Sequence, residues 1–286
     1  MRLQKLIKGA VQIIRPELPL IAGLCVVIGE LLALGRLPSF RTAALGFALG
    51  FFLSSSAMIF NDYFDLEVDR INAPQRPLPA GLLTRSDVIA LGVFTALISQ
   101  ALAWILQPLV LALSLAAWLL GFLYNWKLKA AGLWGNLIVS TNVALTFILG
   151  GIAVGQAWNG IVWTFGLIAF FFDLAEEIAG DAMDAEGDQL RSSRSIAIIL
   201  GKRTALMISG GLFGMVILST LLPIAWGERS LAYLLIIVFT DMLIASLVIK
   251  LLKSQTPAEG RWAMRGLYLT ATFGLLAFWV GRLLAR

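Results

Sequence analysis

Long uncharged stretches, separated by short polar connections, run through the whole chain. A helix that crosses the hydrocarbon of a bilayer needs about 20 apolar residues, and the stretches divide naturally at that length. The two longest are each long enough for two spans, with turn signals at Gln107-Pro108 and near residues 156–160. The expected spans are residues 18–34, 43–60, two between 87 and 127, two between 130 and 172, and then 205–226, 231–252 and 262–284. The pattern predicts an all-α membrane protein with nine transmembrane helices in one bundle.

Composition supports this interpretation and excludes several functions. The 286 residues are 59% hydrophobic and 14% charged, whereas soluble domains carry about 25% charged residues. The basic residues form no tail and do not alternate with aromatics, so no nucleic-acid partner is expected. Histidine is absent, which excludes histidine-based catalysis and metal sites. The polar connections are too short for a separate soluble domain, so we expect one transmembrane domain over residues 1–286.

The distribution of positive charge orients the predicted bundle. Most of the 22 lysine and arginine residues lie in the N-terminal segment and in the connections after the second, fourth, sixth and eighth spans. Cytoplasmic connections of membrane proteins are enriched in these residues. We therefore expect a multi-pass protein of the cell membrane with a cytoplasmic N-terminus.

An acidic cluster follows the second expected span, in the sequence Asn61-Asp62-Tyr63-Phe64-Asp65-Leu66-Glu67-Val68-Asp69. If the helix continues, Asp62, Asp65 and Asp69 stand at i, i+3 and i+7, within roughly 60° of one another on one face. Asn61 and Asp65 are four residues apart and close enough to hold one ion. Like charges on one face repel unless a cation lies between them, and hard oxygen ligands suit Mg²⁺.

A second cluster repeats the same D-x-x-D-x-x-x-D spacing after the sixth expected span, with Asp181, Asp184 and Asp188. Two such clusters, each at the end of an apolar stretch and on the same cytoplasmic side, predict a site built from two halves. We expect metal ligation by Asn61, Asp65, Asp184 and Asp188 and catalytic roles for all six aspartates. The simpler alternative is a pair of solvated acidic loops.

The expected chemistry follows from the ion. Mg²⁺ bound through few protein ligands completes its shell with water and substrate phosphates, so a diphosphate on a long apolar tail fits both metal and membrane. Such a metal stabilises a diphosphate leaving group, and an acceptor can then capture the allylic carbon. Cations for the remaining charge are available in the cytoplasmic connections, and the segment Tyr124 to Lys129 brings a phenol, the amide of Asn125 and two cations to one connection. The expected substrate-binding residues are Arg15, Arg76, Tyr124, Lys127, Lys129 and Arg194.

At these motifs the chain resembles the UbiA superfamily of intramembrane prenyltransferases, and the resemblance covers nearly the whole chain. It implies a nine-helix fold with N-D-x-x-D-x-x-x-D after the second helix and D-x-x-D-x-x-x-D after the sixth. It also implies that Tyr124 and Lys127 lie near the diphosphate and that Asn136, in the Gly135-Asn136 pair, belongs to the site. The segments at residues 71–81, 184–188 and 193–197 are most similar to archaeal enzymes of ether-lipid synthesis and to the chlorophyll synthases.

This branch implies geranylgeranyl diphosphate as donor and geranylgeranylglyceryl phosphate as acceptor, with Asp62 taking the proton of the acceptor hydroxyl. One departure bears on the acceptor. The archaeal enzymes tend to read R-E-I-x-K-D before the second motif, whereas this chain reads Glu176-Glu177-Ile178-Ala179-Gly180-Asp181. The loss of two cations leaves a chlorophyllide or an aromatic quinone precursor open as the acceptor.

A transporter is the main alternative, because polar clusters in a many-span bundle also mark ion paths. It predicts polar residues through the spans to the far side, but most of the 17 acidic residues lie at 62–69 or 173–188. Glu30 and Asp241 are the intramembrane carboxylates elsewhere, and each is a functional candidate or a packed polar contact. The sequence predicts no oligomeric state.

Overall fold

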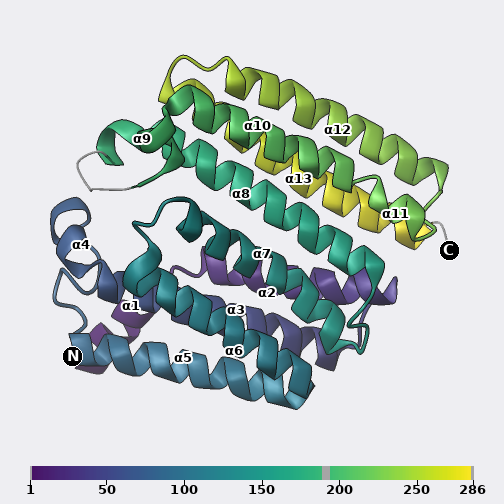
Figure 1. Cartoon of the computed structure of the whole chain (residues 1–286). Helices are drawn as coiled ribbons and strands as arrows, with labels where there is room; N and C mark the ends of the chain where they lie inside the picture. Colours follow the sequence, from purple (N-terminus) through teal and green to yellow (C-terminus); the bar gives the residue numbers. More distant parts are fainter. Residues whose placement is uncertain (1, 189–193, 285–286) are drawn as a thin grey trace. The chain divides into compact units, whose positions relative to one another are not determined.

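The computed structural model describes residues 2–188 and 194–284, and every regular element in these ranges is helical (Figure 1). Side chains are described for residues 6–185 and 194–280. The prediction of an all-α protein is confirmed. Contacts divide the chain into two compact units. Unit 1 comprises the chain up to Lys127 together with Leu145–Ala157, and unit 2 comprises Leu128–Ala144 and the chain from Trp158 onward.

Unit 1 contains the two helices that carry the first acidic motif, α3 (Phe40–Phe64) and α4 (Leu66–Asn72). Its other elements are α1 (Arg2–Ile14), α2 (Glu17–Leu34), α5 (Arg85–Leu106), α6 (Pro108–Leu123), most of the π-helical turn η1 (Tyr124–Leu128) and the C-terminal part of α7 (Leu133–Ala153). Helix α5 begins with a capping box in which Thr84 and Asp87 exchange hydrogen bonds with each other's backbone. The predicted turn at Gln107-Pro108 is confirmed, because Pro108 opens α6.

Helix α3 packs against both α2 and α5 in the middle of unit 1. Small residues allow the close approach of α2 and α3, since a Cβ at Gly50 would lie 2.7 Å from the carbonyl oxygen of Ala22. Close helix contacts through small residues are typical of membrane bundles. An apolar cluster that includes Ile13, Ile59 and Leu83 packs α1 and the segment after α4 against the motif-bearing end of α3.

Unit 2 contains the N-terminal part of α7 and the remaining helices. These are α8 (Gly160–Asp188), α9 (Ile196–Leu200), α10 (Lys202–Ser219), α11 (Leu222–Ala225), α12 (Leu231–Leu252) and α13 (Pro257–Leu284). Helix α8 packs against α10 and α13, with the Ser209 hydroxyl donating to the Ala175 carbonyl at 2.7 Å. Phe172 and Phe213 meet edge to face in the apolar core. This packing fixes α8, which carries the second motif.

Eight helices of the described residues are long and apolar enough to cross a membrane. They correspond to eight of the nine expected spans; the other expected span falls in α8, which has 29 residues. Helix α8 carries Asp173, Glu176 and Glu177 before the second motif, and these charges interrupt its apolar stretch. Nine spans, a single domain and a cytoplasmic N-terminus therefore stay predictions.

Candidate active site

The first acidic motif lies where α3 passes into α4. The backbone turns at Asp65, yet the i to i−4 hydrogen bonds run on, from the Asp65 amide to Asn61 and from the Asp69 amide to Asp65, at 2.9 and 2.8 Å. The expected helical face is thus retained through a local irregularity. Asp62 and Asp69 are both buried and share a cation, which confirms that they lie on a common face.

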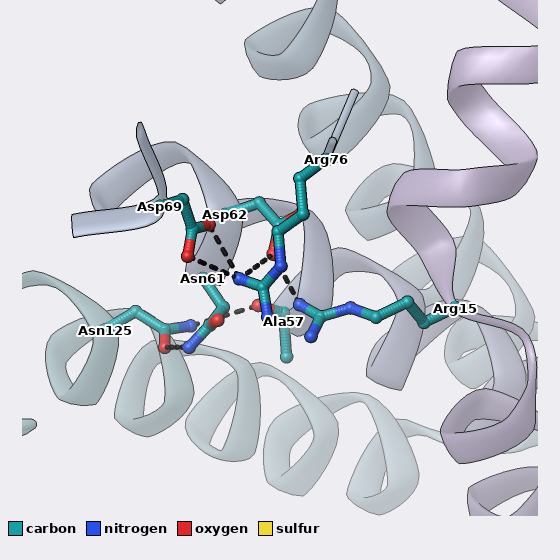
Figure 2. A network of polar contacts seen from close by, with 7 residues as sticks. All are labelled: Arg15, Ala57, Asn61, Asp62, Asp69, Arg76 and Asn125. Carbon is teal, nitrogen blue, oxygen red and sulfur yellow. Dashed lines mark hydrogen bonds and ion pairs between the residues drawn. The ribbon is translucent and has the colours of Figure 1, made fainter. Parts of the chain in front are cut away.

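That cation belongs to the protein itself. Nη1 of Arg76 donates to both oxygens of Asp69, at 2.7 and 2.6 Å, and lies 3.5 Å from the carboxylate of Asp62 (Figure 2). Arg15 pairs with the same Asp62 carboxylate from the other side. The side chains of Asp62 and Asp69 are only 2% and 7% exposed, so their charges need these partners. Arg15 and Arg76, two predicted substrate-binding residues, are therefore brought to the motif.

Both arginines approach from connections. Arg15 stands between α1 and α2 with φ at 48°, a left-handed conformation uncommon for a residue with a side chain, and its guanidinium points toward α3 (Figure 2). Arg76 lies in a turn after α4, where its backbone amide donates to the Ala73 carbonyl at 2.9 Å. Burial by itself lowers the pKa of Arg76. The hydrogen bond to Asp69 and the negative charges of Asp62, Asp69 and Asp65 together outweigh this effect, so the pKa of Arg76 lies above its ordinary value. Arg76 is a permanent cation here.

Asn61 is held by Asn125, whose amide the sequence places in the Tyr124 to Lys129 segment but which was not among the predicted site residues. Its side-chain amide donates to Oδ1 of Asn125 at 3.1 Å, and Nδ2 of Asn125 donates to the Ala57 carbonyl at 3.0 Å. Asn125 belongs to η1, the turn that also carries Tyr124 and Lys127. Lys127 is exposed with its ammonium 4.1 Å from the ring centroid of Trp126, and Tyr124 is half-buried.

The second motif lies at the end of α8, in unit 2. Nδ2 of the buried Asn136 donates to Asp181 at 3.0 Å, which places this predicted residue at the motif. Asp184 is exposed and pairs with Arg261 of α13 at 2.7 Å. The side chain of Asp188 lies outside the described residues. Helix α8 extends to Asp188, so the expected helical spacing of the second motif is confirmed.

The predicted cations Lys129 and Arg194 lie in two connections of unit 2, before α7 and before α9. Both side chains are exposed. The backbone amide of Arg194 donates to the carbonyl of Ala130 at 3.4 Å, which joins the segment before α9 to the start of α7. Gly132, with φ at 58°, lies so close to the Arg194 carbonyl that a Cβ there would overlap it. The glycine is required at this contact.

Three further carboxylates on α8 precede the second motif: Asp173, Glu176 and Glu177. Ser140 of α7 donates to Asp173 at 2.8 Å, and the Tyr268 hydroxyl of α13 bonds Glu176. A spacing of four residues places Asp173, Glu177 and Asp181 on one helical face. This spacing was the signal in the sequence that could have added Asp173 and Glu177 to the candidate residues. None of the three was among the predicted site residues, although Glu176 marks the departure that bears on the acceptor.

The two intramembrane carboxylates, Glu30 and Asp241, lie on helices that carry neither motif. Glu30 is fully buried in α2, and neither carboxylate oxygen has a hydrogen-bond partner among the described residues. It packs against Gly46 of α3. Asp241 of α12 accepts a hydrogen bond from Thr220 at 2.8 Å. The other carboxylate oxygen of Asp241 has no hydrogen-bond partner among the described residues.

The donor set fits a hard divalent cation held together with a phosphate ligand. Within the described side chains, no three carboxylates or thiols gather closely enough to form a protein-only cage. The groups present are carboxylate and amide oxygens, accompanied by the guanidinium groups of Arg15 and Arg76. Mg²⁺ suits such oxygens and commonly binds through one or two carboxylates plus substrate phosphates.

Comparison with known proteins decides the family. The chain matches the UbiA prenyltransferase family over residues 22–282. It belongs to the UbiA prenyltransferase family. The resemblance inferred from the two motifs is thereby confirmed, and so is the prediction that the protein is a prenyltransferase rather than a transporter.

Relatives within the UbiA family support the same branch that the motifs indicated. Digeranylgeranylglyceryl phosphate synthase of Thermococcus kodakarensis is 32% identical over 96% of this chain and 98% of its own length. The synthase of the same name from Methanopyrus kandleri is 34% identical over 95% and 98%. A solved structure from work on digeranylgeranylglyceryl phosphate synthase in membranes has a TM-score of 0.86 and 26% identity, covering 97% of this chain and 98% of that one. A UbiA homologue from Archaeoglobus fulgidus, bound to DMAPP and Mg²⁺, shares the fold with a TM-score of 0.66 and 17% identity, over 94% of this chain and 98% of that one.

Proposed function

We propose that this protein transfers a geranylgeranyl group from geranylgeranyl diphosphate to geranylgeranylglyceryl phosphate, in the synthesis of membrane ether lipids. The observation that carries this proposal is the network of alternating carboxylates and guanidinium groups at the end of α3. It stands on a chain related along its length to digeranylgeranylglyceryl phosphate synthases. Buried carboxylates suit a metal ion, and the guanidinium groups suit the phosphates that accompany it.

The two motifs supply the ligands in this proposal. Asn61 and Asp65 would hold one Mg²⁺, and Asp184 and Asp188 would hold another. When bound, Mg²⁺ stabilises the departing diphosphate as a Lewis acid. Arg15, Arg76, Tyr124 and Lys127 bind the phosphate oxygens of the donor, and Asn136 holds Asp181 in place. Lys129 and Arg194 take the phosphate of the acceptor.

Arg15 and Arg76 couple substrate binding to proton transfer. Both contact Asp62, and phosphate oxygens compete with this carboxylate for the guanidinium groups. A diphosphate that draws the arginines away leaves Asp62 able to accept the proton of the acceptor hydroxyl. The bond between the allylic carbon and the diphosphate oxygen breaks, and an ether bond to the acceptor oxygen forms in its place.

The proposed arrangement in the membrane has nine spans, one domain and both motifs at the cytoplasmic face of the cell membrane. Helix α8, the sixth span in chain order, is added to the eight helices that meet the length and hydropathy criteria and brings the number to nine. At about 1.5 Å per residue, its 29 residues are long enough to cross the hydrocarbon. The enrichment of lysine and arginine in the connections on one side supports this orientation.

The test is a transfer assay with purified protein, labelled geranylgeranyl diphosphate and Mg²⁺, with products resolved by mass. Geranylgeranylglyceryl phosphate, a chlorophyllide and an aromatic quinone precursor are offered in turn. We expect the digeranylgeranyl ether product from the glycerophosphate alone. Prenylation of an aromatic or chlorophyllide acceptor, with the glycerophosphate untouched, would overturn the assigned acceptor but not the family.

A further inference from the structure

Asn125 forms a clamp on the helix that carries the first motif. It is 8% exposed, and its side chain reaches two successive turns of α3. Nδ2 donates to the Ala57 carbonyl at 3.0 Å, and Oδ1 accepts from Nδ2 of Asn61 at 3.1 Å (Figure 2). Ala57 and Asn61 are one helical turn apart, so one side chain bridges the turn just before the motif.

The chemistry of these groups fixes the orientation of both amides. A backbone carbonyl can only accept a hydrogen bond, so Asn125 must direct its NH₂ group toward Ala57. Its oxygen then faces Asn61, and Asn61 must offer its own NH₂ group in return. The carbonyl oxygen of Asn61 is therefore directed away from Asn125. An asparagine that could flip would present NH₂, which cannot ligate a metal, about as readily as oxygen.

We propose that Asn125 is a positioning residue that orients Asn61 so that its amide oxygen, and not its NH₂ group, is presented to the metal ion. This inference rests on the proposed function, in which Asn61 is a metal ligand. Partners of metal ligands that fix their orientation commonly change metal affinity by about 10- to 100-fold when they are removed. Asn125 never touches the metal or the substrate in this arrangement.

The π-helical turn explains how Asn125 reaches α3. It follows α6 without a break, and isolated π-helical turns of this kind are frequent at functional sites. Within the turn Asn125 is buried, whereas its neighbours Trp126 and Lys127 are exposed. The turn therefore directs an amide into the protein from a segment whose next two side chains face outward.

Metal binding provides the direct test. Full-length protein in detergent is titrated with Mn²⁺ in the presence of inorganic diphosphate, and free Mn²⁺ is measured by electron paramagnetic resonance. We expect Asn125→Leu to weaken Mn²⁺ binding about 10- to 100-fold. Ser56→Ala is the matched control, because Ser56, like Asn125, is a buried polar residue, and its hydrogen bonds at 3.0 and 2.9 Å join α3 to Gly92 and Trp118, outside the motif. It should leave Mn²⁺ affinity unchanged.

A double-mutant cycle with Asn61→Asp separates orientation from folding. A carboxylate presents an oxygen on either side, so the orientation of position 61 no longer matters in that background. Asn125→Leu should then weaken Mn²⁺ binding by less than about threefold, on the logic that coupled residues are non-additive. Losses of equal size in both backgrounds would show that Asn125 acts through folding and would overturn the inference.

The outcomes also distinguish this inference from the proposed function. A wild-type protein that binds no Mn²⁺ with diphosphate and transfers no prenyl group overturns both. A wild-type protein that binds Mn²⁺ while Asn125→Leu matches Ser56→Ala overturns the inference alone. Melting temperatures of all variants are measured in parallel. If Asn125→Leu does not fold, Asn125→Ala takes its place in the cycle.

Discussion

Replacement of Arg76 by methionine tests whether the ion network at the end of α3 is a buried structure. Nη1 of Arg76 contacts both oxygens of Asp69, at 2.7 and 2.6 Å, and lies 3.5 Å from Asp62. Methionine keeps much of the side-chain bulk but removes the charge and every donor. The variant leaves Asp69 without its described cation and brings two buried carboxylates into opposition without Arg76 between them.

The magnitude follows from the exposure of the three side chains. Removing one partner of a fully buried ion pair costs about 3–5 kcal/mol, and surface pairs contribute about 0–1 kcal/mol. The carboxylates are 2% and 7% exposed but the guanidinium is 30% exposed, so water takes over part of its role. We expect a loss of about 2–3 kcal/mol for Arg76→Met, which lies between these limits.

Arg70→Met is the matched control, since Arg70 also pairs with an acidic residue of the same segment. It contacts Glu67 at 2.8 Å, but these side chains are 58% and 68% exposed. We expect a loss below about 0.5 kcal/mol. In thermal unfolding of detergent-solubilised protein, Arg76→Met should lower Tm by about 5–10 °C and Arg70→Met by about 1 °C. Equal shifts would refute the view that Asp62 and Asp69 depend on a buried cation.

Three further outcomes are expected. EDTA should abolish prenyl transfer and added Mg²⁺ should restore it, because diphosphate departure is otherwise unassisted; full activity in chelator contradicts the metal assignment. Alanine at Asp65 or Asp184 should lower kcat at least about 100-fold, whereas alanine at Asp241 should have little effect, and equal losses would mean that the motifs act only through folding. Cysteines placed at positions 67 and 186, with Cys25 replaced, should both react with a membrane-impermeant reagent from the cytoplasmic side; labelling from opposite sides contradicts the topology.

Most of the helical architecture was accessible from the sequence because it depends on local signals. Pro108 cannot donate a backbone hydrogen bond and so marks a helix start, and the structure begins α6 there. The expected span at 231–252 coincides with α12. Hydropathy alone was less informative for α8, because Asp173 and its acidic neighbours lie within the same helix as the apolar segment.

The site was predicted only in part, because helical spacing identifies residues on one face but not what meets them. The aspartates and Asn61 were predicted from their spacing. Asn125 was not assigned a role, because the direction of its side chain depends on a π-helical turn that the sequence of residues 124–128 does not predict. The contact of Arg15 with Asp62 joins positions 47 residues apart and depends on the packing of α1 and α2 against α3.

The two motifs show why equal spacing does not mean equal chemistry. In the first, Asp62 and Asp69 are buried and neutralised by arginines from the connections around α3 and α4. In the second, Asp184 is exposed and pairs with Arg261, 77 residues later in the chain. A surface pair exchanges readily with water and ions, whereas a buried pair holds its partners until a competing charge replaces them. Under the proposed function, a metal ion would therefore displace Arg261 from Asp184 at small cost, whereas Asp62 would become able to accept a proton only when an anion such as diphosphate takes over Arg15 and Arg76. Two segments with the same aspartate spacing thus differ in how readily their carboxylates exchange partners.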